Sequence, residues 1–248
     1  MAIPRGAVRA ISFDYGHVLG GLDLQELLGR LEELGATATD RAQTPGLLAA
    51  LHAALPEAYR AHDDAIGAGL GHERAWRRLM ERIVEASGKV GASHLDETVD
   101  ALWRAQPMRN LWRWVPDEAR ALLAELGAAG VPMVVTSNSE GRAAELLEEV
   151  GLARHFRAIL DSGRTGVAKP DRRMFEQAAA ALGVEADAMV HVGDSESADV
   201  VGAVDAGAFA IRFDAFVPGA ATRPTVAHAR AGDFSTLRRL LLEALDLP

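Results

Sequence analysis

The sequence contains no cysteine. This absence excludes disulfide bonds and thiolate metal sites, and it favours a reducing compartment. No apolar run approaches the ~20 residues that a membrane-spanning helix needs. Residues 1–9 also lack the charged, apolar and small-residue pattern of a signal peptide. We therefore expect a cytoplasmic protein that does not insert into a membrane.

Lysine is rare, and the 35 acidic residues outnumber the 26 basic ones. The formal net charge is −9, which disfavours nucleic acid as a partner. An acidic protein can still bind phosphate locally, so a small phosphorylated molecule remains a possible partner. Of the 26 basic residues, only Lys89 and Lys169 are lysine, so a lysine inside a motif is less easily explained by chance. The 248 residues, 49% of them apolar, suit one large globular domain or two modest ones.

Short apolar segments alternate with amphipathic ones over much of the chain. The segments expected to form buried strands are Val8–Phe13, Pro132–Thr136, Ala158–Leu160, Met189–Val192 and Phe209–Phe213. The helices expected among and after them are Asp117–Leu126, Gly141–Val150, Arg172–Leu182, Ala198–Asp205 and Leu237–Leu245. Strands that alternate with helices of ~10 residues predict an α/β protein with a doubly wound, Rossmann-like parallel sheet. Ligands bind beyond the carboxyl ends of such strands, where Asp14, Ser137 and Asp194 fall.

The stretch from about residue 20 to 107 has a different pattern, because it contains no convincing strand. Its expected helices are Leu24–Leu34, Gly46–Leu55, Glu57–Ile66, Glu73–Ala86 and His94–Ala105, with Pro56 separating the second from the third. We interpret it as an all-helical insertion after the first strand. The expected domains are therefore a core of residues 1–20 and 108–248 and an insertion of residues 21–107.

Four short motifs follow one another in the chain. They are ISFDYGHVL at 11–19, VVTSN at 134–138, KPD at 169–171 and VGDSESAD at 192–199. Each motif alone is weak evidence, but the four in this order, at the ends of predicted elements, resemble the haloacid dehalogenase-like hydrolases. The resemblance covers nearly all of residues 8–215. It implies a phosphatase whose helical insertion is a cap over the site.

The resemblance also implies a role for each site residue. Asp14 would be the nucleophile that attacks phosphorus and forms an aspartyl-phosphate, with Lys169 placing positive charge on that pair. A Mg²⁺ ion would be held by Asp14, Asp194 and the backbone carbonyl of Gly16, since all-oxygen ligation suits that ion. Phosphate binding is the role implied for Ser137, Asn138 and Lys169. Asp199 would lie just behind the metal ligands and position Lys169 or a metal-bound water.

The sequence departs from the family at one position. Most phosphatases of the family carry a second Asp two residues after the nucleophile, as general acid and base, and this chain has Gly16 there. General acid–base catalysis is typically worth ~10²–10⁴-fold. We therefore expect a substrate with a good leaving group, such as a sugar 1-phosphate or an acyl phosphate. His17, one residue further along, is the obvious substitute for the missing acid, because histidine often serves as a general acid and base. A place in a loop or at the cap interface is nevertheless the more common explanation for such a residue.

Each candidate residue also has a purely structural interpretation. Taken alone, Asp14 is most often a turn residue or a helix cap, and Ser137-Asn138 a helix N-cap. Lys169-Pro170 alone is more often a solvated loop, and Asp194 and Asp199 could merely cap the helix that follows them. Four such explanations, all at strand ends, are less economical than one site. Two other functions remain open. One is a 2-haloacid dehalogenase that uses Asp14 on carbon, which the presence of Asp194 and Asp199 disfavours. The other is a module that binds phosphate and Mg²⁺ without turnover.

Overall fold

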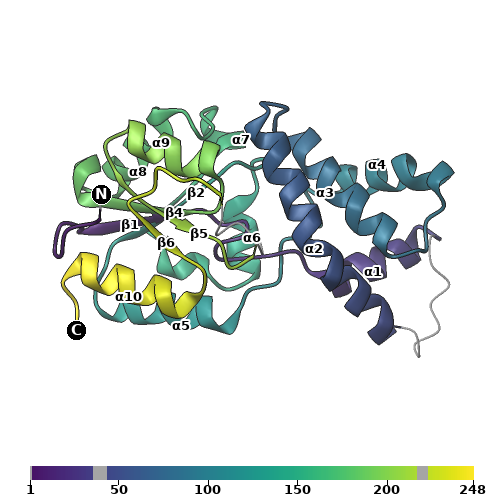
Figure 1. Cartoon of the computed structure of the whole chain (residues 1–248), viewed down its shortest axis with the longest axis horizontal. Coiled ribbons are helices and arrows are strands. Elements are labelled where there is room, and N and C mark those ends of the chain that lie inside the picture. Colours follow the sequence, from purple (N-terminus) through teal and green to yellow (C-terminus); the bar gives the residue numbers. More distant parts are fainter. Residues whose placement is uncertain (1, 36–43, 217–222) are drawn as a thin grey trace. The chain divides into compact units, whose positions relative to one another are not determined.

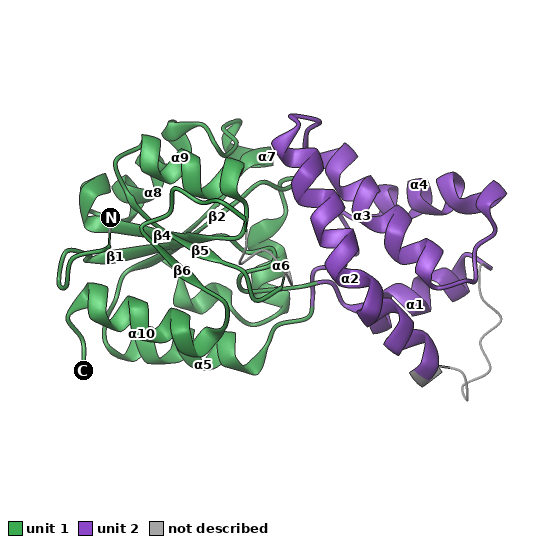
Figure 2. Cartoon of the chain, in the orientation of Figure 1, with its two compact units in different colours: residues 1–21, 114–248 green, residues 22–113 purple. Residues whose placement is uncertain are grey.

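The computed structural model describes residues 2–35, 44–216 and 223–248. These residues divide into two compact units (Figure 2). The sheet unit comprises Met1–Gly21 and Trp114–Pro248, and the helical unit comprises Leu22–Arg113. The sequence predicted boundaries at residues 20/21 and 107/108, whereas the two units divide at residues 21/22 and 113/114. Of the helices in the described ranges, none combines the length and apolar character that a membrane crossing requires.

The sheet unit is built on six parallel strands in the order β3-β2-β1-β4-β5-β6 (Figure 1). The strands are β1 (Ala10–Phe13), β2 (Met133–Ser137), β3 (Ala158–Asp161), β4 (Met189–Gly193), β5 (Phe209–Phe213) and β6 (Ala229–Ala231). Every residue of β1, β2 and β4 is buried, as expected for central parallel strands that are covered on both faces. The doubly wound α/β fold expected from the sequence is confirmed, although β6 was not predicted.

Helices cover both faces of this sheet, with α8 and α9 on one side and α5 and α10 on the other (Figure 1). The helices of the unit are α5 (Asp117–Ala128), α6 (Ala143–Glu149), α7 (Ser162–Thr165), α8 (Arg172–Leu182), α9 (Val201–Asp205) and α10 (Phe234–Leu245), with 3-10 turns η3 (Ala153–His155) and η4 (Ala186–Ala188) and a π-helix η5 (Glu196–Val200). Both ends of α8 have typical capping residues. At its start Asp171 accepts a hydrogen bond from the Arg173 N–H, and at its end Gly183 adopts a φ of 73°. Met174 and Phe175 on this helix are fully buried against the sheet.

In its described residues, the helical unit contains helices and no strand. Its elements are α1 (Leu24–Glu33), α2 (Thr44–Gly67), α3 (His72–Ala86), the 3-10 turn η2 (Ala92–His94) and α4 (Leu95–Ala105). The expected break at Pro56 is wrong, because α2 runs through it. Proline inside a helix costs about 3 kcal/mol. Leu51 and Tyr59, on either side of Pro56, are both buried, and α2 packs along α3. This tertiary packing offsets the local cost.

Candidate active site

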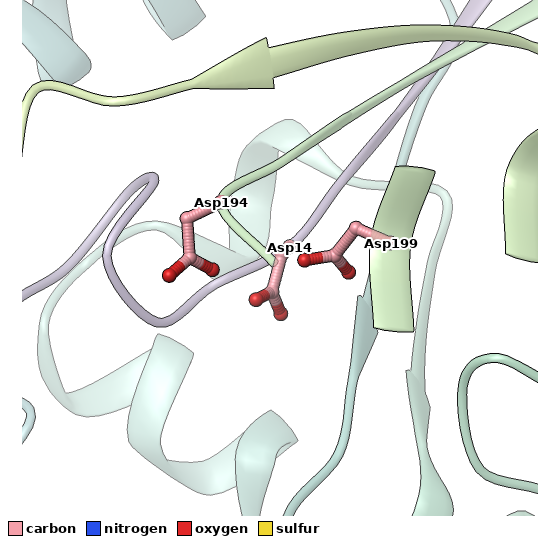
Figure 3. A group of neighbouring side chains, drawn as sticks. All are labelled: Asp14, Asp194 and Asp199. Carbon is pink, nitrogen blue, oxygen red and sulfur yellow. The ribbon is translucent and has the colours of Figure 1, made fainter. Parts of the chain in front are cut away.

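Three carboxylates meet at the carboxyl edge of the central strands. Asp14 follows β1 directly, Asp194 follows β4, and Asp199 lies in η5 just beyond (Figure 3). Each offers one oxygen, and these oxygens all lie within 4.8 Å of one another. Three carboxylates at this spacing repel each other unless positive charge lies among them. Their donors are all oxygen, which suits a hard divalent cation.

The local sequence brings Asp199 close to the strand ends. The chain after β4 forms a π-helix, in which the Val200 N–H donates to the Ser195 carbonyl over 3.1 Å. The Asp199 carboxylate accepts the Ser195 N–H over 2.9 Å. Gly193 makes this approach possible, because a Cβ on it would lie 2.2 Å from the Asp199 Cβ. Single π-helical turns occur often at functional sites, and this one turns an acidic side chain back onto its own strand.

Lys169 provides the positive charge inside the cluster. Its Nζ lies 2.8 Å from Asp14 Oδ1 and 2.6 Å from Asp199 Oδ1, and its side chain is 2% exposed. The loop that carries it has a cis peptide bond to Pro170. The Asn138 side chain holds the backbone of this loop, since its Nδ2 donates to the Lys169 carbonyl and its Oδ1 accepts the Lys169 N–H. The Asn138 amide thus positions the lysine, a task that the sequence did not indicate.

The charges of the cluster shift one another's titration. Burial raises the pKa of Asp14 to about 7; the charges of Asp199 and Asp194 add to the rise, and Lys169 opposes it. Burial lowers the pKa of Lys169, but Asp14 and Asp199 outweigh it and hold that pKa above its ordinary value. Burial acts to raise the pKa of Asp199, but Lys169 and a hydrogen bond from His191 hold it below its usual range. A cation beside Asp14 would favour its charged form.

Ser137 is the last residue of β2, at the same edge of the sheet, and is 7% exposed. The loop that follows is held by a residue that the sequence analysis missed. Asp161, at the end of β3, accepts hydrogen bonds from the N–H groups of Gly141, Ala143 and Gly163 over 3.1, 2.8 and 2.9 Å. It could have been found by the criterion that selected Asp14, because it too is an acidic residue at the end of an apolar strand.

Gly16 and His17 lie in a tight turn directly after Asp14. In this turn the Gly20 N–H donates to the Tyr15 carbonyl and the His17 N–H to the Gly20 carbonyl. His17 adopts a φ of 57° and is 4% exposed. Its Nδ1 lies 3.2 Å from Asp194 Oδ2. The imidazole is therefore bonded to a member of the carboxylate cluster. His191 and Ser12, two further polar side chains behind the cluster, were also missed.

Known proteins resemble this chain in sequence. A family model described as haloacid dehalogenase-like hydrolase matches residues 17–207. Haloacid dehalogenase-like hydrolase domain-containing protein 3 of Bos taurus is 30% identical over 190 residues, which cover 73% of this chain and 75% of that protein. Phosphoserine phosphatase of Thermus thermophilus is 35% identical over 151 residues, covering 60% of this chain and 57% of that protein.

Solved structures share the fold at lower identity. A HAD phosphatase from Thermococcus onnurineus superposes with a TM-score of 0.57 at 20% identity, covering 95% of this chain and 99% of that one. A 2-haloacid dehalogenase from Pseudomonas syringae gives a TM-score of 0.55 at 21% identity, covering 94% and 98%. Likeness at these identities shows the fold alone. A parallel sheet with three carboxylates at its strand ends, two of them paired with a buried lysine, together with the matches in sequence, defines a hydrolase. The chain belongs to the haloacid dehalogenase-like hydrolase family.

Proposed function

We propose that this chain is a Mg²⁺-dependent phosphatase that hydrolyses a small phosphorylated metabolite through an aspartyl-phosphate on Asp14. The observation that carries the proposal is the position of Lys169 Nζ, 2.8 Å from Asp14 Oδ1 and 2.6 Å from Asp199 Oδ1. A carboxylate beside a buried ammonium is suited to a reaction whose substrate brings negative charge to it. Relatives named as phosphoserine and phosphoglycolate phosphatases support the same class of reaction.

The donor set fits Mg²⁺. Asp14 and Asp194, with the carbonyl of Gly16, would hold the ion, because all three offer oxygen donors. Burial, and after it the charges of Asp199 and Asp194, raise the pKa of Asp14, and a bound cation would favour its charged form. Asp199 is engaged by Lys169 and the Ser195 N–H, so it would lie behind the ligands. When bound, Mg²⁺ would offset the carboxylate charge and polarise a phosphoryl oxygen.

The remaining chemistry belongs to residues of the chain. A carboxylate oxygen of Asp14 attacks phosphorus, the bond from phosphorus to the leaving oxygen breaks, and the electron pair departs with that oxygen. Ser137 and the N–H groups that follow it would hold a phosphoryl oxygen, and Lys169 would hold another beside Asp14. Water then attacks the phosphorus of the aspartyl-phosphate, loses a proton to solvent, and releases phosphate with the carboxylate restored. The helical unit would act as the cap that selects the substrate.

Gly16 limits the class of leaving group. No side chain at this position can protonate the departing oxygen, and His17 is bonded to Asp194. We propose that the substrate is a sugar 1-phosphate or an acyl phosphate, whose leaving oxygen needs little protonation. Alkyl phosphates such as phosphoserine are then expected to turn over ~10²-fold or more slowly, the lower bound of what an acid contributes. Equal rates for alkyl and anomeric phosphates would refute this part of the proposal.

The test is a phosphate-release screen over phosphorylated metabolites, with and without Mg²⁺. We expect wild-type turnover that chelator abolishes and Mg²⁺ restores, and no turnover by Asp14→Asn. Asp246→Asn, the same change at an exposed position paired with Arg5, is the matched control and should keep full activity. Turnover by Asp14→Asn at the wild-type rate would contradict the proposal. Halide release from a 2-haloacid would instead indicate a dehalogenase, and thermal stabilisation by phosphorylated ligands without phosphate release would indicate a binding module.

A further inference from the structure

A row of buried polar side chains runs across the sheet behind Asp199. Thr136, Ser12 and His191 lie on β2, β1 and β4, which are neighbouring strands, and each is at most 1% exposed. Ser12 Oγ lies 3.3 Å from Thr136 Oγ1 and 3.0 Å from His191 Nδ1. His191 Nε2 lies 3.2 Å from Asp199 Oδ1. The row therefore ends on the carboxylate that contacts Lys169.

The direction of each hydrogen bond in the row follows from its last member. Asp199 lies between the Lys169 ammonium and the Ser195 N–H, so it is an ionised carboxylate that can only accept. His191 Nε2 must then carry the proton and donate. Burial lowers the pKa of the His191 imidazole, so the ring is neutral. Its Nδ1 then accepts a hydrogen bond from the Ser12 hydroxyl. The Ser12 oxygen is left to accept from Thr136, and one tautomer of the imidazole is selected.

A purely structural role does not explain why the row exists. Buried polar groups cost stability unless every one is bonded, and apolar residues would fill the same space without that requirement. The His191 ring already packs edge-on against Phe175, with centroids 5.0 Å apart, as an apolar ring would. What an apolar residue could not supply is the third hydrogen bond to Asp199, the one that completes its set of donors.

We propose that His191 is a positioning residue, which acts through Asp199 to hold Lys169 Nζ against Asp14. With the imidazole in place, Asp199 Oδ1 receives donors from two sides and Oδ2 from a third, so the carboxylate is fixed in all directions. Without it, Oδ1 is free to follow the ammonium, and Lys169 can move away from Asp14. The catalytic consequence rests on the proposed phosphatase function.

The first measurement compares His191→Leu with His191→Gln. The Leu variant removes the donor, and we expect kcat to fall by about 10-fold to 100-fold with KM little changed, as for other partners behind a ligand. Glutamine can place an N–H near the position of Nε2, so the Gln variant should recover most of kcat. Val190→Ala is the matched control, since it removes buried volume from the same strand without touching the row, and it should lower stability but not kcat.

The second measurement needs no turnover. Lys89 and Lys169 are the two lysines of the chain, so ¹⁵N-lysine labelling gives two side-chain signals, and Lys89→Arg assigns them. We expect His191→Leu to shift the Lys169 ammonium signal and speed its proton exchange, and His191→Gln to leave both near wild type. If the Leu variant does not fold, Ser12→Ala, which frees the imidazole to change tautomer, takes its place in both measurements.

The outcomes separate the two claims. If neither His191→Leu nor His191→Gln changes the Lys169 ammonium signal or kcat, the inference is overturned. Loss of kcat in the Gln variant equal to that in the Leu variant, with matching loss of thermal stability, would also overturn it, because only packing would then matter. Absence of wild-type turnover on any phosphate ester would refute the proposed function alone, and the lysine signal would still decide the role of His191.

Discussion

Gly193→Ala tests the packing that brings Asp199 into the site. The added Cβ would lie 2.2 Å from the Asp199 Cβ, whereas ordinary contacts begin at 3.4 Å, so Asp199 must retreat by about 1 Å. The ion pair of Asp199 with Lys169, now 2.6 Å, cannot survive that movement unchanged. Misplacement by about 1 Å costs ~10²-fold in rate, and overpacking a buried site costs about 1–3 kcal/mol of stability. We expect both losses, measured as kcat for phosphate release and as the midpoint of thermal unfolding.

Gly29→Ala is the matched control for this experiment. Gly29 lies inside α1, and a Cβ there would meet no atom within 4 Å. The same chemical change should therefore raise the free energy of unfolding by about 0.5–1 kcal/mol, because alanine favours a helix over glycine, and kcat should not change. If Gly193→Ala kept wild-type kcat at its wild-type melting temperature, the close approach of Asp199 to Gly193 would be wrong.

Three further substitutions test other features. Asp161→Ala leaves three N–H groups of the two loops it holds without their acceptor, so urea unfolding should show a loss of about 2 kcal/mol or more; a smaller loss than 1 kcal/mol would contradict this. Pro56→Ala restores an N–H donor inside α2 and should raise the stability of the protein by about 1–3 kcal/mol, and a lower stability would show that the ring packs favourably. His17→Ala removes a partner of Asp194 and should raise the Mg²⁺ concentration needed for half activity, whereas an unchanged requirement would separate the imidazole from the ion.

The sheet could be predicted from sequence because its signals are local. Short apolar runs ended by a polar residue mark each central strand, and parallel strands bring their carboxyl ends to one edge. Asp14 and Asp194 could therefore be placed together before any coordinates were known. The strand β6 was missed because three residues, Ala229–Ala231, carry too little pattern to distinguish a strand from a loop.

The partners behind the site could not be predicted in the same way. His191 and Ser12 face each other because β4 pairs with β1 in one register, and no single segment of sequence reports a register between distant strands. A lone histidine in an apolar run reads equally well as a core residue. The continuity of α2 through Pro56 was hidden for a related reason, because the packing against α3 that offsets the proline is contributed by another part of the chain.

The way in which the chain leaves and re-enters the sheet unit has a practical consequence. Gly21 and Trp114 form an antiparallel bridge, with the N–H of each donating to the carbonyl of the other over 2.8 and 3.3 Å. A segment of 92 residues, Leu22–Arg113, thus begins and ends at one bonded pair, as a hairpin loop does. The segment could therefore be excised at this bridge, and a short turn from Gly21 to Trp114 would leave every strand connection of the sheet intact. A foreign domain could be inserted at the same place.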